Sequence, residues 1–177
     1  MDAKDEKRTF KWFWPWQDER LEHWLGQMSQ QGWHLAGAAW PARYTFTRGE
    51  PADLVYRLDW QETSRKEQPS YRQLFADAGW EHAATHAGWQ IFRRPATNDA
   101  TGEIFTDVDS KVAKYERMIF GAGGAFAAVV VVMMTFLFYD RMDAVLGLLW
   151  AALALAAVYY AVVLAGLSRR TRQLKRL

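Results

Sequence analysis

The chain has no cysteine and only four histidines among its 177 residues. The lack of cysteine excludes disulfides and thiolate metal sites and is typical of a reducing compartment. His82 and His86 have the i, i+4 spacing of two metal ligands on a helix. We expect them on a strand instead, where they would lie about 13 Å apart and could not share one ion. The sequence therefore predicts no metal site and no cofactor.

The motifs of common enzyme classes are also missing. There is no Walker-type phosphate loop, no G-x-S-x-G and no H-E-x-x-H. The first 117 residues have no basic excess, since they hold sixteen Lys and Arg against eighteen Asp and Glu. Nucleic-acid-binding domains carry a basic footprint. We expect a protein that is not an enzyme and does not bind nucleic acid.

Two long apolar runs, residues 118–139 and 144–167, contain no Asp, Glu, Lys, Arg or His. As helices they would be roughly 33 and 36 Å long, enough to cross a hydrocarbon core. Only four residues separate them, so they predict an antiparallel transmembrane hairpin in the lipid bilayer. Burial in a soluble core is the alternative, and two such runs in so short a chain disfavour it.

Basic residues flank both runs. Lys111, Lys114 and Arg117 precede the first run, and the tail of residues 168–177 carries five Lys and Arg. Because cytoplasmic flanks are enriched in Lys and Arg, we expect both termini on the cytoplasmic side of the inner (plasma) membrane. The charged N-terminal residues do not resemble a signal peptide, so residues 1–117 are expected in the cytoplasm.

Small residues recur at four-residue spacing in both apolar runs, a pattern typical of closely packed membrane helices. They are Gly121, Gly124, Ala125 and Ala128 in the first run and Ala157 and Ala161 in the second. We expect them to pack the two spans together or to contact a membrane-protein partner or a second copy of the chain.

The region before the apolar runs contains one pattern twice. Gly32-Trp33 is echoed by Gly79-Trp80, and Trp16-Gln17 by Trp60-Gln61. The order of these matches predicts an α+β fold with two tandem βαββ units, whose strands pair into one antiparallel sheet with both helices on one face. The expected segments are a disordered N-terminus (1–8), the duplicated domain (9–97), a linker with a juxtamembrane helix (98–117), the two spans and the basic tail.

Periodicity locates the elements of each unit. In the first unit we expect a strand at 10–16, a helix from Asp18 that ends at Gly32, and a hairpin of strands 34–39 and 42–48. In the second we expect a strand at 54–60, a helix from Ser70 to Gly79, and a hairpin of strands 81–85 and 90–94 that turns at Gly88. Thr106-x-x-Asp109 predicts the start of the juxtamembrane helix.

Ten tryptophans are more than a small core needs. Alternation places Trp12, Trp14 and Trp16 on one face of the first strand, and Tyr56 and Trp60 on one face of the strand at 54–60. Core packing is one interpretation, and an aromatic cleft or partner surface is the other. The candidate carboxylates beside it are Glu50, Asp59 and Glu62. Aromatic faces with a nearby carboxylate favour lipophilic cations.

Several motifs resemble those of a bacterial family, domain of unknown function 2812. They are Phe10-Lys11-Trp12-Phe13, Gly32-Trp33-His34-Leu35, Tyr44-x-Phe46-x-x-Gly49-Glu50-Pro51, Val55-Tyr56-Arg57-Leu58-Asp59, Asp77-Ala78-Gly79-Trp80-Glu81 and Glu103-Ile104-Phe105-Thr106-Asp107. The resemblance covers about residues 9–117. It implies a hydrophobic C-terminal region and a genetic setting beside PadR-type repressors, and it supplies no catalytic or binding residues.

The expected fold also resembles the duplicated βαββ effector-binding domains of bacterial multidrug-responsive regulators, which bind lipophilic cations between their halves. Together these observations favour a membrane-tethered, non-enzymatic sensor or regulatory adaptor. Its aromatic-rich domain would bind a hydrophobic small molecule or a cytoplasmic regulator. The alternative is a structural accessory subunit of a membrane complex such as a transporter.

Overall fold

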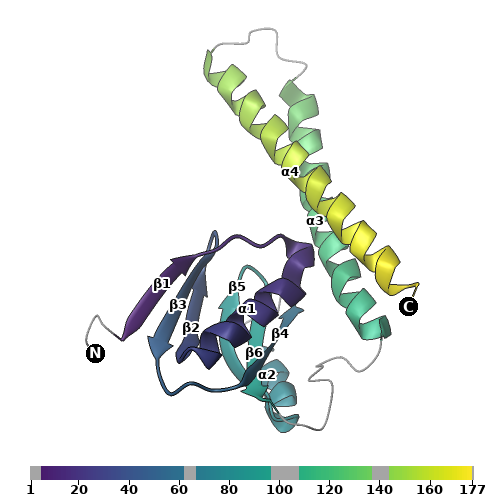
Figure 1. Cartoon of the computed structure of the whole chain (residues 1–177). Helices are drawn as coiled ribbons and strands as arrows, with labels where there is room; N and C mark the ends of the chain where they lie inside the picture. The colour runs from purple at the N-terminus through teal and green to yellow at the C-terminus, as the bar shows by residue number, and fades with distance from the viewer. Residues whose placement is uncertain (1–4, 62–66, 97–107, 137–143, 177) are drawn as a thin grey trace. The chain divides into compact units, whose positions relative to one another are not determined.

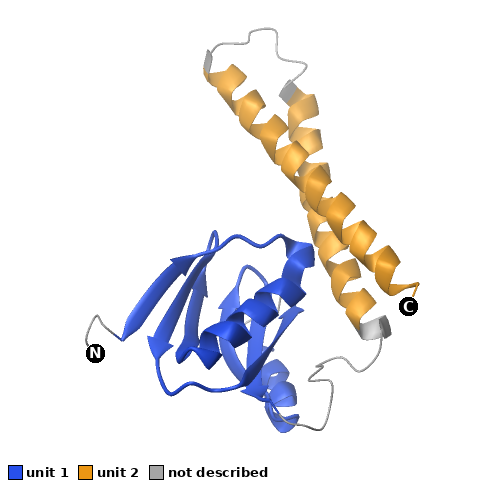
Figure 2. Cartoon of the chain, in the orientation of Figure 1, with its two compact units in different colours: residues 1–106 blue, residues 107–177 orange. Residues whose placement is uncertain are grey.

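Two copies of a strand–helix–strand–strand unit form the first part of the structure, as predicted (Figure 1). The computed structural model describes residues 5–61, 67–96, 108–136 and 144–176. The chain divides into two units, Met1–Thr106 and Asp107–Leu177 (Figure 2). The first copy contains β1 (Glu6–Phe10), η1 (Pro15–Gln17), α1 (Asp18–Gln30), β2 (Trp33–Ala39) and β3 (Arg43–Arg48). The second contains β4 (Leu54–Trp60), α2 (Gln68–Asp77), β5 (Glu81–His86) and β6 (Trp89–Pro95).

Each copy forms its own three-stranded antiparallel sheet rather than half of one sheet. Sheet A has the order β1-β3-β2 and sheet B the order β4-β6-β5, so the third strand of each copy is central. Both second strands have a register irregularity at the equivalent position, between Leu35 and Gly37 in β2 and between His82 and Ala84 in β5. A bulge repeated at one place in both copies supports the duplication.

Both helices end in the same way. Gly32 after α1 has φ +76° and Gly79 after α2 has φ +79°, the left-handed conformation that the sequence predicts. The tryptophan after each glycine lies under a guanidinium from the end of the third strand. The two pairs are Arg48 over Trp33, at 5.0 Å from the ring centroid, and Arg94 over Trp80, at 4.5 Å.

The first strand differs from the prediction. β1 is Glu6–Phe10, so it starts within the segment expected to be disordered and ends where the strand 10–16 was expected to begin. Pro15 instead opens the short helix η1, because its fixed φ suits a first helical position. The Trp14 N–H donates to Gln17 Oε1 at 3.1 Å and the Gln17 N–H to the Trp14 carbonyl at 2.8 Å. The alternating tryptophans therefore belong to a turn, and the strand prediction was wrong.

One core lies under α1 and takes side chains from both sheets. It contains Leu21, Leu25 and Met28 from α1, Leu35, Tyr44 and Phe46 from sheet A, and Tyr56, Leu58, Ala84 and Ile91 from sheet B. A smaller cluster under α2 contains Phe75, Trp80 and Phe92. Ile91 and Phe92 are neighbours in β6 and point to opposite faces. Thus α1 and α2 lie on opposite faces of sheet B, and the prediction that both cover one face was wrong.

The outer edge of sheet B is closed by α1. Leu58 in β4 donates its backbone N–H to Glu22 Oε1 at 2.8 Å, and Arg57 Nη1 lies 3.3 Å from Glu22 Oε2. Ser29 and Tyr56 share a second buried hydrogen bond between their hydroxyls at 2.8 Å. A buried strand edge requires partners for its backbone groups. Glu22, only 9% exposed, supplies one.

The second unit consists of α3 (Val108–Phe136) and α4 (Ala144–Leu174), two apolar helices that pack side by side. Their candidate membrane spans are Lys111–Thr135 and Val145–Leu174, and only 6% of the most apolar stretch of each is buried. By length and composition these helices are compatible with a membrane protein. The predicted turn at residues 140–143 and the predicted cap at Thr106 lie outside the described residues.

Candidate functional site

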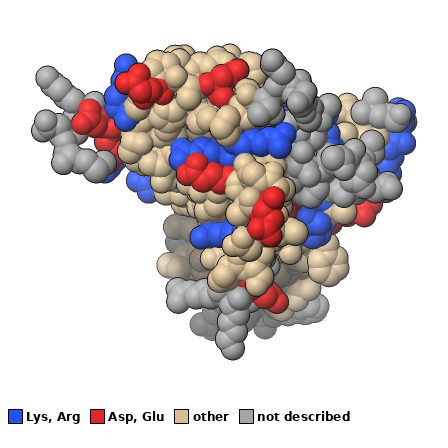
Figure 3. Space-filling view, turned by 90° about the horizontal axis from the view of Figure 1, so that it is seen from below, with Lys and Arg blue, Asp and Glu red and all other residues tan. Residues whose placement is uncertain are grey.

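Exposed aromatic side chains, rather than charge, distinguish one part of the duplicated domain. On the face shown in Figure 3, Lys and Arg are interspersed with Asp and Glu. Exposed pairs such as Arg8 with Glu6, at 2.6 Å, contribute little to stability. The exposed large aromatics of this domain are Phe10 (64%), Trp12 (44%) and Trp40 (74%), among the described residues.

The aromatic residues predicted to share one face lie in different places. Trp12, Trp14 and Trp16 contact one another in series, with ring centroids 5.9 Å and then 5.0 Å apart. Tyr56 is 1% exposed and belongs to the core under α1. Trp60 covers the turn between β5 and β6, where a Cβ on Gly88 would lie 2.6 Å from Trp60 Nε1. The structure groups the first three and separates them from the other two.

The two predicted carboxylates that the structure describes do not border Trp12, Trp14 or Trp16. Asp59 is 3% exposed, and its oxygens accept hydrogen bonds from the Tyr71 hydroxyl at 2.7 Å and the Trp60 N–H at 2.8 Å. Asp59 therefore fastens α2 to β4. Glu50 is exposed and follows β3 at the end away from Trp12. Glu62 lies outside the described residues.

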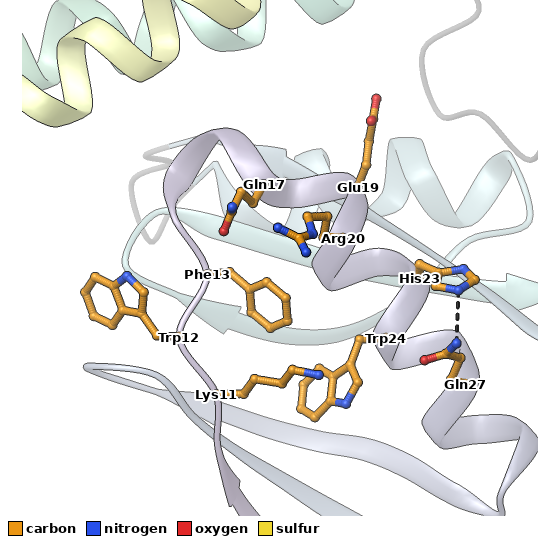
Figure 4. Close-up of a pocket in the computed structure, with 9 residues that line it drawn as sticks. All are labelled: Lys11, Trp12, Phe13, Gln17, Glu19, Arg20, His23, Trp24 and Gln27. Carbon is orange, nitrogen blue, oxygen red and sulfur yellow. Dashed lines mark hydrogen bonds between the residues drawn. The ribbon is translucent and has the colours of Figure 1, made fainter.

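A groove lies between the segment after β1 and the outward face of α1 (Figure 4). Its volume is about 520 Å³. Phe13 and Trp24 form the floor of this α1 groove, with ring centroids 5.8 Å apart. Trp24 in turn contacts the rings of Tyr44 and Phe46 at 5.2 and 5.5 Å, so the floor is continuous with the core. The remaining lining residues are Lys11, Trp12, Gln17, Glu19, Arg20, His23 and Gln27.

Cations dominate the charged lining of the α1 groove. Lys11 Nζ lies 4.7 Å from the centroid of Trp24 and 5.5 Å from that of Phe13. Arg20 is a second cation, and Glu19 is the one carboxylate among the described lining residues. Because Lys11 already covers the aromatic floor, a lipophilic cation would have to displace it. Among its described lining residues the groove thus carries two cations and one carboxylate.

A second hollow, of about 660 Å³, lies between the two sheets. Arg93 crosses it, with Nη2 donating to Glu81 Oε1 at 2.7 Å and Nη1 to the Leu35 carbonyl at 3.4 Å. The hydrogen bond with Glu81 raises the pKa of Arg93, and the same bond lowers the pKa of Glu81. Arg93 therefore links the two sheets, and its charge is paired with that of Glu81.

His82 and His86 lie on a strand, as predicted, because β5 is Glu81–His86. His82 Nε2 lies 2.9 Å from Thr85 Oγ1 and 3.1 Å from Gln90 Oε1. Burial lowers the pKa of both His82 and His86. Within the described ranges, no group of three or more His, Cys, Asp or Glu could hold a metal ion.

The small residues predicted to pack the apolar helices differ in exposure. The exposed ones are Gly121, Gly124, Ala128 and Ala161, and the half-buried ones are Ala125 and Ala157. A Cβ on Gly124 would meet nothing within 4 Å. The helices instead bury larger side chains, including Tyr115, Met118, Val163 and Leu167. The open position at Gly124 does not support its packing against α4, and the packing role of the other small residues stays a prediction.

A family model described as "Protein of unknown function (DUF2812)" matches residues 17–127. The chain belongs to the DUF2812 family. The resemblance of its motifs is thereby confirmed. The DUF2812 match begins at the end of η1, after β1, and runs through the rest of both copies into α3, so the family region includes most of the duplicated domain and part of the first apolar helix. The comparisons with curated proteins and with solved structures found no match.

The sequence analysis of this DUF2812 chain did not identify two residues with specific roles in the structure, Lys11 and Glu22. Lys11 lies within an aromatic run, and its stacking on Trp24 depends on a turn that alternation did not predict. Glu22 lies beside Leu21 and three residues before Leu25, on the buried side of α1. A carboxylate inside an apolar stripe is the signal that could have marked it as a buried acceptor.

Proposed function

We propose that this protein is a membrane-tethered, non-enzymatic sensor or regulatory adaptor. The helices α3 and α4 would hold it in the inner (plasma) membrane, with both termini in the cytoplasm. The duplicated domain would bind a hydrophobic small molecule or a cytoplasmic regulator such as a PadR-type repressor. The exposed apolar surface of α3 and α4 supports the tether, because Phe120 is 86% and Leu148 73% exposed and such side chains need apolar surroundings.

The α1 groove is the observation that carries the binding role. It combines an aromatic floor, formed by Phe13 and Trp24, with a cationic rim formed by Lys11 and Arg20. Small-molecule sites are typically apolar concavities with a few polar groups that orient the ligand. The proposed ligand class is therefore an aromatic or aliphatic molecule with one negative charge. Its apolar part would replace the Lys11 ammonium over Trp24, and its anion would pair with the displaced ammonium.

Two water-soluble probes of the same shape and opposite charge would test this proposal. 2-Naphthoate and 2-naphthylmethylammonium would be titrated into the full chain in lipid nanodiscs, with empty nanodiscs as the blank. We expect calorimetry to detect saturable binding of naphthoate and at least tenfold weaker binding of the ammonium probe.

A matched pair of lysine variants would localise the site. Lys11→Gln should weaken naphthoate binding severalfold, because it removes the cation above the floor. Lys7→Gln is the control, since Lys7 also lies over a tryptophan, at 5.4 Å from the centroid of Trp33, and does not line the groove. Equal effects of the two variants, or no binding of either probe, would count against the α1 groove.

A structural accessory subunit of a membrane complex is the second candidate. It is favoured by the exposed glycines of α3, since the Cβ position of Gly124 is open. Small residues allow another helix to approach closely. Gly124→Leu should then release a co-purifying membrane protein, while Gly147→Leu on α4, where a Cβ also meets nothing within 4 Å, should retain it. Retention by both variants would argue against this role.

A further inference from the structure

We propose that one end of sheet A docks on the surface of an anionic lipid bilayer. The docking surface is the aromatic rim, defined as Phe10, Trp12 and Trp40. The proposal rests on the membrane tether proposed above and goes beyond it, because it gives the duplicated domain a membrane contact of its own.

The fold brings the three rings to one end of the sheet. Phe10 is the last residue of β1 and pairs with Arg43, the first residue of β3. The next residue, Lys11, donates its N–H to the Ala42 carbonyl at 3.0 Å, so the chain that leaves β1 runs beside the turn between β2 and β3. Trp40 lies in that turn, and its carbonyl accepts a hydrogen bond from Arg43 Nη2 at 3.3 Å.

The three side chains of the rim are highly exposed, although large aromatic side chains are unfavourable in water. Phe10 is 64%, Trp12 44% and Trp40 74% exposed. Grouped exposed apolar side chains mark interaction surfaces. Aromatic rings, tryptophan above all, are enriched at the level of lipid headgroups, where an apolar ring and a polar edge are both satisfied.

The charge around the rim fits anionic headgroups. The sequence has no Asp or Glu between Lys7 and Gln17, and none between His23 and Gly49. Glu19, which lines the α1 groove together with Trp12, is a carboxylate near the rim. Lys11 and Arg43 lie directly beside the rim and are exposed. Each basic residue near an anionic surface adds to the electrostatic attraction of the domain for that surface. A partner with an acidic, partly apolar surface is therefore favoured, and the bilayer that holds the tether presents one.

The connection to the apolar helices allows the contact. Residues 97–107 separate the end of the second repeat from α3, and a chain of this length spans at most roughly 40 Å. A domain of about 100 residues has a radius of gyration near 13 Å. By length alone, this connection is long enough for the rim to contact the bilayer, and the tether would keep the rim at high local concentration beside it.

The absence of cysteine allows a direct test with single-cysteine variants of the full chain. Ala39→Cys places a probe beside the rim and retains its three rings, and Ala76→Cys on α2 is the matched control, because both alanines are exposed. Each variant would carry a nitrobenzoxadiazole label in vesicles of phosphatidylcholine, with or without phosphatidylglycerol. Lipids with a nitroxide in the headgroup region would serve as quenchers.

We expect the quencher to remove more than half of the emission at position 39 in vesicles with phosphatidylglycerol, and little of the emission at position 76. Adding Phe10→Ser and Trp40→Ser to Ala39→Cys should abolish the difference, and because both rings are exposed, the fold should be retained. Equal quenching at both positions would overturn the proposal. So would copper-catalysed disulfides between copies through position 39, which would assign the rim to a second copy of the chain.

Flotation separates failure of this proposal from failure of the tether. A chain that floats with vesicles after an alkaline carbonate wash, and shows no quenching at position 39, retains its tether and has no docked rim. A chain that the carbonate wash removes from the vesicles contradicts both proposals.

Discussion

The two halves of the duplicated domain share a local plan and differ in which sheet face they cover. Arg8 in β1 and Leu58 in β4 occupy equivalent positions, opposite Thr45 and Ile91 respectively. The side chain of Arg8 is 81% exposed, whereas Leu58 is 3% exposed in the core. The apolar pair lets sheet B bury this face under α1, and the polar pair leaves the same face of sheet A in solvent.

The two helices of the duplicated domain also differ in burial, and α1 is the more buried. Buried residues of α1 contact side chains from both sheets, and its Glu22 closes the edge of β4. In α2 only Phe75 is buried, and Leu74 is 67% exposed. Duplication therefore preserved the helix ends and the bulge in the second strand, while a few side chains gave α1 a core shared by both sheets. The α1 groove and the aromatic rim also belong to the first half.

The largest expected difference between the halves concerns the two equivalent phenylalanines, Phe46 and Phe92, both 0% exposed. Either substitution to Ala should cost about 3–5 kcal/mol, the usual range for a buried Phe. Phe46→Ala should raise hydrogen exchange in both sheets, because its core is shared. Phe92→Ala should raise it chiefly in α2 and β5. Identical exchange patterns would contradict the shared core.

Glu22 offers a second contrast, since position 69, its counterpart in the second half, is a proline. Glu22→Ala should destabilise the domain by about 2 kcal/mol, because it leaves the buried N–H of Leu58 without its acceptor. Glu22→Gln keeps an acceptor oxygen and should cost less. Urea unfolding followed by tryptophan fluorescence would measure both. An equal cost for the two variants would show that charge, not the backbone hydrogen bond, is what matters.

Local features of the fold could be predicted from the sequence, whereas the placement of the sheets could not. Gly32, Gly79 and Gly88 take positive φ as their positions in the pattern predict, because such turns are set by the residues themselves. Burial of Tyr56 depends on which face of sheet B α1 covers, and that choice involves contacts distant along the chain. The α1 groove was missed for a different, local reason, because residues 10–16 were predicted as a strand although Pro15 opens η1.

Substitution of the two helix-ending glycines should reveal a smaller difference in stability between the halves. Both have positive φ, so Gly79→Ala should cost about 1 kcal/mol from backbone strain alone. Gly32→Ala should cost more, because its Cβ would lie 2.6 Å from the Gly49 carbonyl oxygen, whereas a Cβ on Gly79 meets nothing within 4 Å. Melting temperatures of the two variants would test the difference. Equal decreases in melting temperature would indicate that the backbone near Gly49 moves away from the new Cβ without a loss of stability.

The smallest expected effect is a dependence on pH that belongs to the second half. Burial lowers the pKa values of His82 and His86 below the ordinary 6.5. The unfolded chain then binds more protons than the folded chain as the pH falls through 6.5, so these groups stabilise the fold above that pH and the contribution is lost below it. Position 35, the counterpart of His82, is a buried leucine that cannot titrate.

We therefore expect the melting temperature to fall modestly between about pH 7.5 and pH 5.5, and hydrogen exchange to increase first in β5 and β6. His82→Gln should reduce this pH dependence, because it retains a hydrogen-bond donor toward Thr85 and Gln90 and removes the titration. The ion pair between Glu81 and Arg93 can be distinguished from the histidine effect by pH. Because the pKa of Glu81 is lowered, the stability that this pair contributes is lost only below pH 4.5, the ordinary pKa of a glutamate. If exchange increased first in α1 and β2, the acid-sensitive part would lie in the first half and the contrast between the halves would fail.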